Sequence, residues 1–336
     1  MKKHTLVLFG ILVLALSGLS LSCAKREEPA LIVYTYDSFV AEWGAGPKIA
    51  PLFEKATGIK VEFVAKGDGG QLLSALILEK DAPRADIALG LDDNLAEKAL
   101  SAGILEPYAA KALEGIPAEL RFDPSNRLLP FDFGHFAIIW DSEKLASPPK
   151  GLEDLASPAF AKKLILMDPR TSTPGLGFLA WTKAVYGANW KEYWARLRPS
   201  VLAMTPGWDT GYGLFTAGEA PLVLSYATSP AYHKEYDKTE RYKALSFAEG
   251  HVRQIEAAGI VKGARHRKNA EKFLEFLLSA EAQAEIPLTQ WMLPANPAAP
   301  LPESYSAALR PGSTLAVDRA GLFEDAAAAA QILAGK

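Results

Sequence analysis

The feature that most constrains the fold of this chain is a regular alternation of short apolar runs and helical patterns that begins at Leu31. Apolar or β-branched runs predict strands at 31–36, 60–65, 86–91, 136–140, 164–167 and 222–226. Apolar residues at helical spacing, with glycine closing two of the segments, predict helices at 47–57, 71–80, 94–102, 176–186 and 231–237. This order predicts an α/β fold with mostly parallel sheets.

Two extended segments, 131–140 and 247–261, predict crossings between two lobes. A chain that leaves one lobe, builds a second and returns would form a hinge of two crossing segments and a ligand cleft. We assign 31–132 plus 250–336 to the first lobe and 133–249 to the second, which fits roughly 150 residues per domain. Residues that follow each strand should face the cleft, because ligands of open α/β sheets bind beyond the carboxyl ends of the strands.

The amino terminus has the pattern of an export signal. Lys2 and Lys3 precede an apolar run at 6–16, and small residues follow. The run is shorter than the roughly 20 apolar residues of a membrane-spanning helix. We predict a signal peptide at 1–22, and therefore a protein exported to the periplasm or the cell surface.

Cys23 is the only cysteine in the chain and follows this signal directly. We predict that it is the lipidation site of a lipoprotein and that 23–30 form a tether to the membrane, because a lone thiol is unusual in an oxidising compartment. Ser20 stands where a lipoprotein signal usually has leucine. The alternative is an ordinary signal peptide with a stray cysteine.

Aromatic and polar side chains follow several predicted strands, and the candidates for a ligand-facing wall are Tyr36, Trp43, Trp208, Tyr226, Tyr232 and Trp291. Rings that converge on a cleft suit a flat cationic ligand, since a cation over a ring gains roughly 0.5 to 2 kcal/mol. The alternative is that these rings are core residues with polar tips. The net charge of −3 does not favour nucleic acid and suits a cationic or neutral ligand.

Asp68 lies between two glycines, where the flexible backbone can present its carboxylate to a positive ligand. The alternative is a turn aspartate that bonds its own backbone. The segments 171–174 and 228–230 resemble helix starts, with hydroxyl residues before proline. Their free amides could bind a hydroxyl or a phosphate, or both segments could be simple caps.

Longer blocks of the sequence resemble the thiamine-binding proteins of bacterial ABC transporters. The similarity spans 31 to about 295, and its blocks are 34–39 with Trp43 and Gly44, 85–92, 131–134, 168–177, 212–215, 222–233, 249–251 and 291–292. The resemblance implies the two-lobed fold of type II periplasmic binding proteins. It also implies a monomer without cofactor that binds thiamine, thiamine monophosphate or thiamine diphosphate and delivers it to the ABC permease. Residues after Asn296 match no part of this family.

The resemblance also implies roles for particular residues. The positions that match the family's site are Tyr36, Trp43, Asp68, Ser172, Trp208, Tyr226, Tyr232 and Trp291. The rings would enclose the pyrimidine and the thiazolium, and Asp68 would meet the ligand's amino group or charge. Ser172, Trp208, Tyr226 and Tyr232 would lie at the hydroxyethyl or phosphate end.

Three other functions are compatible with such a fold. A thiaminase of the cysteine type needs a nucleophile, but Cys23 belongs to the export signal, so we expect no enzyme. A ferric-ion binding protein would use tyrosines and carboxylates, but the adjacent tyrosine pair typical of such proteins is absent, so we expect no metal site. A polyamine binder remains the nearest alternative, because aromatic walls and an acid also hold aliphatic ammonium groups.

Overall fold

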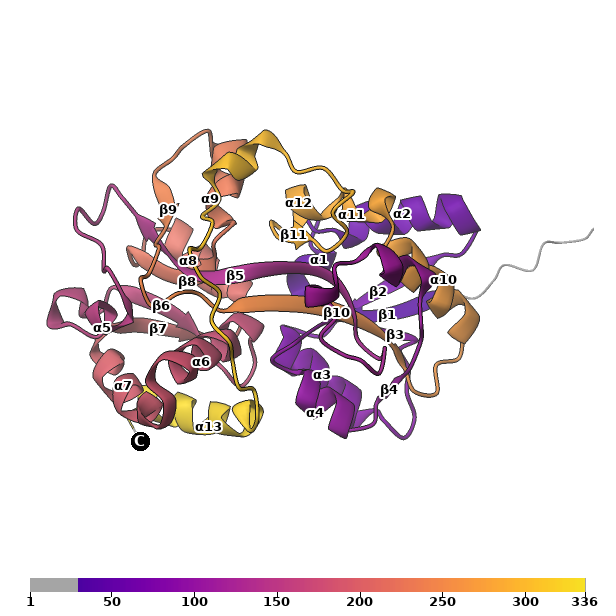
Figure 1. Ribbon diagram of the computed structural model, residues 1–336, viewed down its shortest axis with the longest axis horizontal. Helices are drawn as coiled ribbons and strands as arrows, with labels where there is room; N and C mark the ends of the chain where they lie inside the picture. Colours follow the sequence, from indigo (N-terminus) through magenta and orange to yellow (C-terminus); the bar gives the residue numbers. More distant parts are fainter. Residues whose placement is uncertain (1–29, 336) are drawn as a thin grey trace, which may run out of the picture.

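One mixed sheet runs through both halves of the molecule, and helices flank it in each half (Figure 1). The structure, a computed structural model, describes residues 30–335. The predicted signal peptide, Cys23 and the tether up to residue 29 lie outside the described residues. From residue 30 to residue 335, no helix has both the length and the apolar character needed to span a bilayer.

The first lobe contains a parallel set of three strands among the five strands that the structure describes there. Its strands are β1 (Leu31–Thr35), β2 (Val61–Ala65), β3 (Ile87–Asp92), β4 (Leu105–Glu106) and β11 (Leu293–Pro294). Its helices are α1 (Asp37–Val40), α2 (Gly46–Thr57), α3 (Gly69–Leu78), α4 (Ala96–Ser101), α10 (Arg267–Leu277), α11 (Ala280–Gln283), α12 (Ile286–Thr289) and the 3₁₀ turns at Lys111–Gly115 and Ala118–Leu120. β1 is central and pairs in parallel with β2 and β3. The carboxyl ends of these strands therefore meet at one edge, which faces the second lobe.

The second lobe repeats this plan with a parallel set in which β6 is central. Its strands are β6 (Leu164–Met167), β7 (Val201–Thr205), β8 (Leu222–Tyr226) and β9 (Tyr242–Ala244). Its helices are α5 (Leu152–Leu155), α6 (Thr173–Tyr186), α7 (Trp190–Leu197), α8 (Trp208–Thr216), α9 (Ser229–Tyr232), the 3₁₀ turns at Pro158–Phe160, Gly187–Asn189 and Arg198–Ser200, and a π-helix at His233–Asp237. The sequence predicted an α-helix through 237, but its last five residues form the π-helix.

Two long strands, β5 (Leu129–Asp141) and β10 (Arg253–Val261), connect the lobes, and we call them the crossing strands. They pair with one another antiparallel, β10 also pairs antiparallel with β3, and β5 continues into the second lobe beside β8. Parallel pairing is therefore confined to the interior of each lobe, and the sheet as a whole is mixed. In Figure 1 the crossing strands run side by side through the middle of the molecule.

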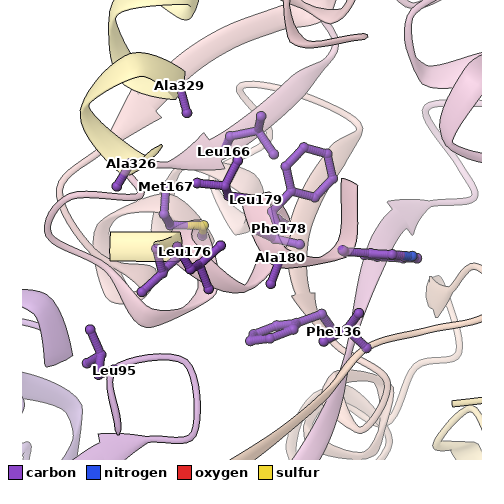
Figure 2. Close-up of a cluster of buried hydrophobic side chains, with 14 of the residues drawn as sticks. Leu95, Phe136, Leu166, Met167, Leu176, Phe178, Leu179, Ala180, Ala326 and Ala329 are labelled. Atoms are coloured by element: carbon purple, nitrogen blue, oxygen red, sulfur yellow. The ribbon is translucent and has the colours of Figure 1, made fainter. Parts of the chain in front are cut away.

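The core of the second lobe forms around α6, whose Leu176 and Phe178 are buried with Leu166 and Met167 of β6. Figure 2 shows that alanines of the last helix, α13 (Leu322–Leu333), face the same cluster. α13 contacts α6 and α7, and its Asp325 forms an ion pair of 2.5 Å with Lys183.

The assignment of 250–336 to the first lobe is therefore wrong for its final helix, and also for the 3₁₀ turn Glu303–Ala307, which packs against α9 and the π-helix of the second lobe. The segment before α13 passes back over the crossing strands, where Thr314 forms a β-bridge with His251 and Arg319 bonds Asp93 at 2.5 Å. The apolar face of a helix shows that the helix packs against a core, but it does not show which lobe provides that core.

Candidate functional site

A cavity of about 270 Å³ lies between the lobes at the carboxyl ends of the strands. Six of the eight predicted ligand-binding residues line it: Tyr36, Trp43, Asp68, Trp208, Tyr226 and Trp291. Tyr36 directly follows β1, and Tyr226 ends β8, as the strand-end rule predicts. Rings from both halves of the chain thus meet at one place. The part of the ligand that each ring would contact stays a prediction.

Trp208 is held in place from two sides. Its ring stacks on Tyr212 with centroids 4.9 Å apart and an interplanar angle of 19°. Its indole Nε1 donates a hydrogen bond of 2.8 Å to the Ser225 hydroxyl. Behind it, the Tyr212 hydroxyl lies 2.8 Å from Nε2 of the buried His233. A ring fixed in this way can stack on a ligand without a large loss of side-chain entropy.

His233 is the first residue of the π-helix. Its Nδ1 lies 2.6 Å from Oδ2 of Asp237, and its Nε2 meets Tyr212, so both ring nitrogens are occupied. Burial lowers the pKa of His233, against the opposing effect of Asp237. The imidazole therefore acts as a neutral spacer behind the aromatic wall.

Trp291 closes the cavity from the segment after α12. Its backbone has φ +57°, which is unusual for a bulky residue and indicates a conformation maintained by its surroundings. The indole stacks on the Tyr305 ring, with ring centroids 6.4 Å apart, and packs edge-on against the Tyr232 ring, with centroids 5.4 Å apart. Tyr232 itself lines an adjoining cavity of about 710 Å³, which shares Trp43, Trp208 and Trp291 with the first.

Asp68 joins the two lobes. It is the N-cap of α3, where its Oδ1 accepts from the Gly69 amide at 2.6 Å, and Gln71 completes the capping box. The same Oδ1 accepts from the Thr173 amide and hydroxyl at 3.3 and 3.1 Å, and Oδ2 accepts from the Trp208 amide at 3.1 Å. One carboxylate therefore meets the first turns of three helices, α3, α6 and α8.

The two predictions for Asp68 are thus not exclusive, because the residue lines the cavity and also satisfies backbone amides. The Thr173 amide of α6, at one of the two helix starts where we expected a ligand hydroxyl or phosphate, is bonded by this carboxylate, and so is the Trp208 amide of α8. The close approach of the start of α3 to the second lobe depends on glycine. A Cβ at Gly69 would lie 2.3 Å from Thr173 Cγ2, and one at Gly70 would lie 2.9 Å from the Thr171 backbone.

The lining of the 270 Å³ cavity is acidic. Among residues 30–335, this lining contains the carboxyl groups of Asp37, Asp68, Asp209 and Glu256 and no lysine, arginine or histidine. Burial, together with the charges of Asp37 and Asp68, raises the pKa of Asp209. A positive ligand would relieve this repulsion, so the electrostatics of the cavity favour a cation.

Two residues at the bottom of the cavity were missed by the sequence analysis. The Tyr36 hydroxyl lies 2.9 Å from Oε2 of Glu256 and 3.0 Å from Oε1 of Gln290. Glu256 is an acid inside the apolar run of the second crossing segment. That pattern, a single acid in an otherwise buried strand, was the available signal.

The family assignment follows from comparison with known proteins. Residues 82–313 match the family model described as bacterial extracellular solute-binding protein. This chain belongs to that family. The thiamine-binding periplasmic protein of Brucella abortus biovar 1 is 46% identical over 301 residues, which cover 89% of each chain. The protein of the same name from Escherichia coli K12 is 40% identical over 86% of this chain and 87% of its own.

A solved structure supports the same assignment. The structure titled periplasmic thiamin binding protein matches this solute-binding protein with a TM-score of 0.85 and 37% identity, over 92% of this chain and 96% of the other. The predicted resemblance and the type II periplasmic binding protein fold are thereby confirmed.

Ser172 is the predicted site residue that this solute-binding protein places outside both cavities. It is the N-cap of α6, but its hydroxyl makes no cap bond, is buried, and has no hydrogen-bond partner among residues 30–335. Asp68 from the opposite lobe bonds the Thr173 amide instead. Within the same residues, no three histidine, cysteine, aspartate or glutamate side chains are grouped so that they could hold a metal ion.

Proposed function

We propose that this solute-binding protein captures thiamine, or its monophosphate or diphosphate, between its lobes and delivers it to the permease of an ABC importer. One observation carries the proposal: aromatic rings from both lobes line a cavity that contains four acidic side chains and, in the described part of the chain, no basic one. Thiamine combines a flat aminopyrimidine with a cationic thiazolium. Ring faces and carboxylates are the groups that bind such a ligand.

The same proposal holds that the protein binds and releases its ligand without changing it chemically. The protein would act as an exported monomer, anchored by a lipid at Cys23, with no cofactor and no catalytic step. Its relatives are named as binding proteins, which supports this view. Recovering thiamine unchanged after prolonged incubation with the protein would test it, and cleavage into pyrimidine and thiazole products would contradict it.

Calorimetric titration of the mature protein tests the ligand class. The titrants are thiamine, thiamine monophosphate, thiamine diphosphate, spermidine and ferric citrate. We expect tight binding of at least one thiamine form, with weak or no binding of the other two compounds. Tight binding of spermidine or ferric citrate, with none of the thiamine forms bound, would overturn the proposal.

A further inference from the structure

Each crossing strand carries one carboxyl group at the same level of the hinge. Asp132 of β5 and Glu256 of β10 are direct partners in the antiparallel ladder. Side chains of such partners lie on one face of the sheet, with Cβ atoms about 4.5 to 5.5 Å apart. Both residues are buried, with exposures of 0% and 6%. The hinge therefore contains two neighbouring carboxyl groups in a place with little water.

The groups around this pair do not balance its charge. Neither oxygen of Asp132 accepts a hydrogen bond from residues 30–335. Glu256 accepts from the Tyr36 hydroxyl at 2.9 Å and from Nε2 of Gln254 at 3.1 Å. Within the described chain, neither carboxyl forms an ion pair with a lysine, arginine or histidine. Two adjacent buried carboxylates without a cation cannot both stay ionised.

The other titratable groups that face Glu256 are acids and phenols. They come from the ends of three strands and from the start of α3: Tyr36, Asp92, Tyr226 and Asp68. Burial raises the pKa of Asp132 well above its usual range. Burial, and next the charge of Asp132, raises the pKa of Glu256 in the same direction. Burial and Asp93 raise the pKa of Asp92 to about 7.

We propose that Asp132 and Glu256 form a proton-holding carboxyl pair in the hinge, and that this pair exchanges a proton for the positive charge of the ligand. The inference rests on the proposed function, because it assumes a cationic ligand in the cavity. Glu256 lines that cavity, so its carboxylate can contact the cation directly. On binding, the O–H bond of the carboxyl group breaks, the proton passes to the solvent buffer, and the carboxylate keeps the electron pair.

A second polar group at the bottom of the cavity completes the recognition surface. Gln290 also lines the cavity, and its Nε2 has no hydrogen-bond partner among the described residues. The carboxylate of Glu256 and this amide together present an acceptor and a donor to the ligand. That combination fits an amino-substituted, nitrogen-containing aromatic ring and would not be complete for a simple alkylammonium group.

The ligand-free protein provides the first test. Infrared spectroscopy at pH 7.5 should show the carbonyl stretch of a protonated carboxylic acid. This band should weaken in Glu256→Gln and in Asp132→Asn and should keep its intensity in the control Glu153→Gln, which changes an exposed acid far from the cavity. Absence of the band from the unaltered protein would overturn the proposal, whether or not thiamine binds.

Thiamine calorimetry in two buffers of different ionisation enthalpy provides the second test. The unaltered protein should release about one proton per bound thiamine, so its affinity should rise up to about tenfold per pH unit between pH 5 and 8. Glu256→Gln should release none and bind about 10- to 100-fold more weakly. Tight binding with no proton release, and equal affinity in Glu256→Gln, would overturn this inference and leave the proposed function intact. Failure of the unaltered protein to bind any thiamine form would instead overturn both the proposed function and the ligand exchange.

Discussion

The cleft contains two acidic sites that differ in their surroundings: Asp68 at the contact between the lobes, and the Asp132–Glu256 pair in the hinge. Asp68 accepts hydrogen bonds from the amides of Gly69, Thr173 and Trp208 and from the Thr173 hydroxyl. Asp132, although completely buried, accepts none from the described residues. The number of hydrogen-bond donors around a carboxylate, more than its burial, therefore decides its role. A carboxylate with many donors stabilises the structure, and one without donors is suited to a ligand.

Helix geometry explains the difference. Asp68 faces the positive ends of α3, α6 and α8, where free amides and the helix dipoles favour an anion. The crossing strands have no such ends, because their amides are used in the sheet. Four substitutions would break or sharpen this contrast.

The largest effect is expected from Asp68→Ala. It removes the acceptor shared by the amides of Gly69, Thr173 and Trp208 and should weaken thiamine binding by about 2 to 3 kcal/mol. The physical reason is the loss of the bonds to Thr173 and Trp208, which exist only when the lobes touch. Calorimetry measures the change, and Asp81→Ala, at an exposed acid, is the matched control. Unchanged affinity would mean that the bonds of Asp68 across the cleft contribute nothing to binding.

Asp132→Asn should make the folded protein more stable at high pH. A carboxyl group whose pKa is raised by folding stabilises the native state fully below its unfolded pKa of about 3.9, and this contribution is lost as pH rises through the folded value. The asparagine of the variant does not ionise, so the variant does not lose stability in this way as pH rises. We expect its free energy of unfolding to exceed that of the unaltered protein by about 1 to 2 kcal/mol at pH 8, and the difference should shrink at pH 4. Urea unfolding at the two pH values measures it, and an equal difference at both would contradict the argument.

His135 tests whether the hinge penalises charge of either sign. Burial, followed by the charges of His251 and Arg253, lowers the pKa of His135 to about 4. Its stabilising contribution is present above the unfolded pKa of about 6.5 and is lost as pH falls toward 4. Between pH 7 and pH 4, the free energy of unfolding of His135→Gln should therefore fall by about 1 kcal/mol less than that of the unaltered protein. Parallel pH profiles of the two proteins would exclude this role.

The smallest effect is expected at the mouth of the cavity. Trp43 is 45% exposed, so Trp43→Ala should leave the melting temperature almost unchanged. Loss of its ring should weaken thiamine binding by about 0.5 to 1 kcal/mol, the value of an exposed cation–π contact. A large fall in the melting temperature would show that the ring is a core residue. Trp190→Ala, in the buried core, is the contrasting variant in which stability should fall.

Much of the fold could be read from local patterns. The strands at 164–167 and 222–226 occupy the predicted residues, and most predicted helices lie within a few positions of those observed. Local periodicity determines such elements because apolar side chains must share one face of a helix or strand. Part of the site was predictable for the same reason, since strand ends place Tyr36 and Tyr226 at the cleft.

The tertiary structure decided what depends on contacts between distant segments. The register of β5 against β10 brings Asp132 opposite Glu256, and the approach of the lobes brings Asp68 to α6 and α8. The alanine face of α13 became part of the second lobe only through its fit against α6. Register and docking arise from the packing of whole surfaces, and no residue type or spacing within one segment specifies them.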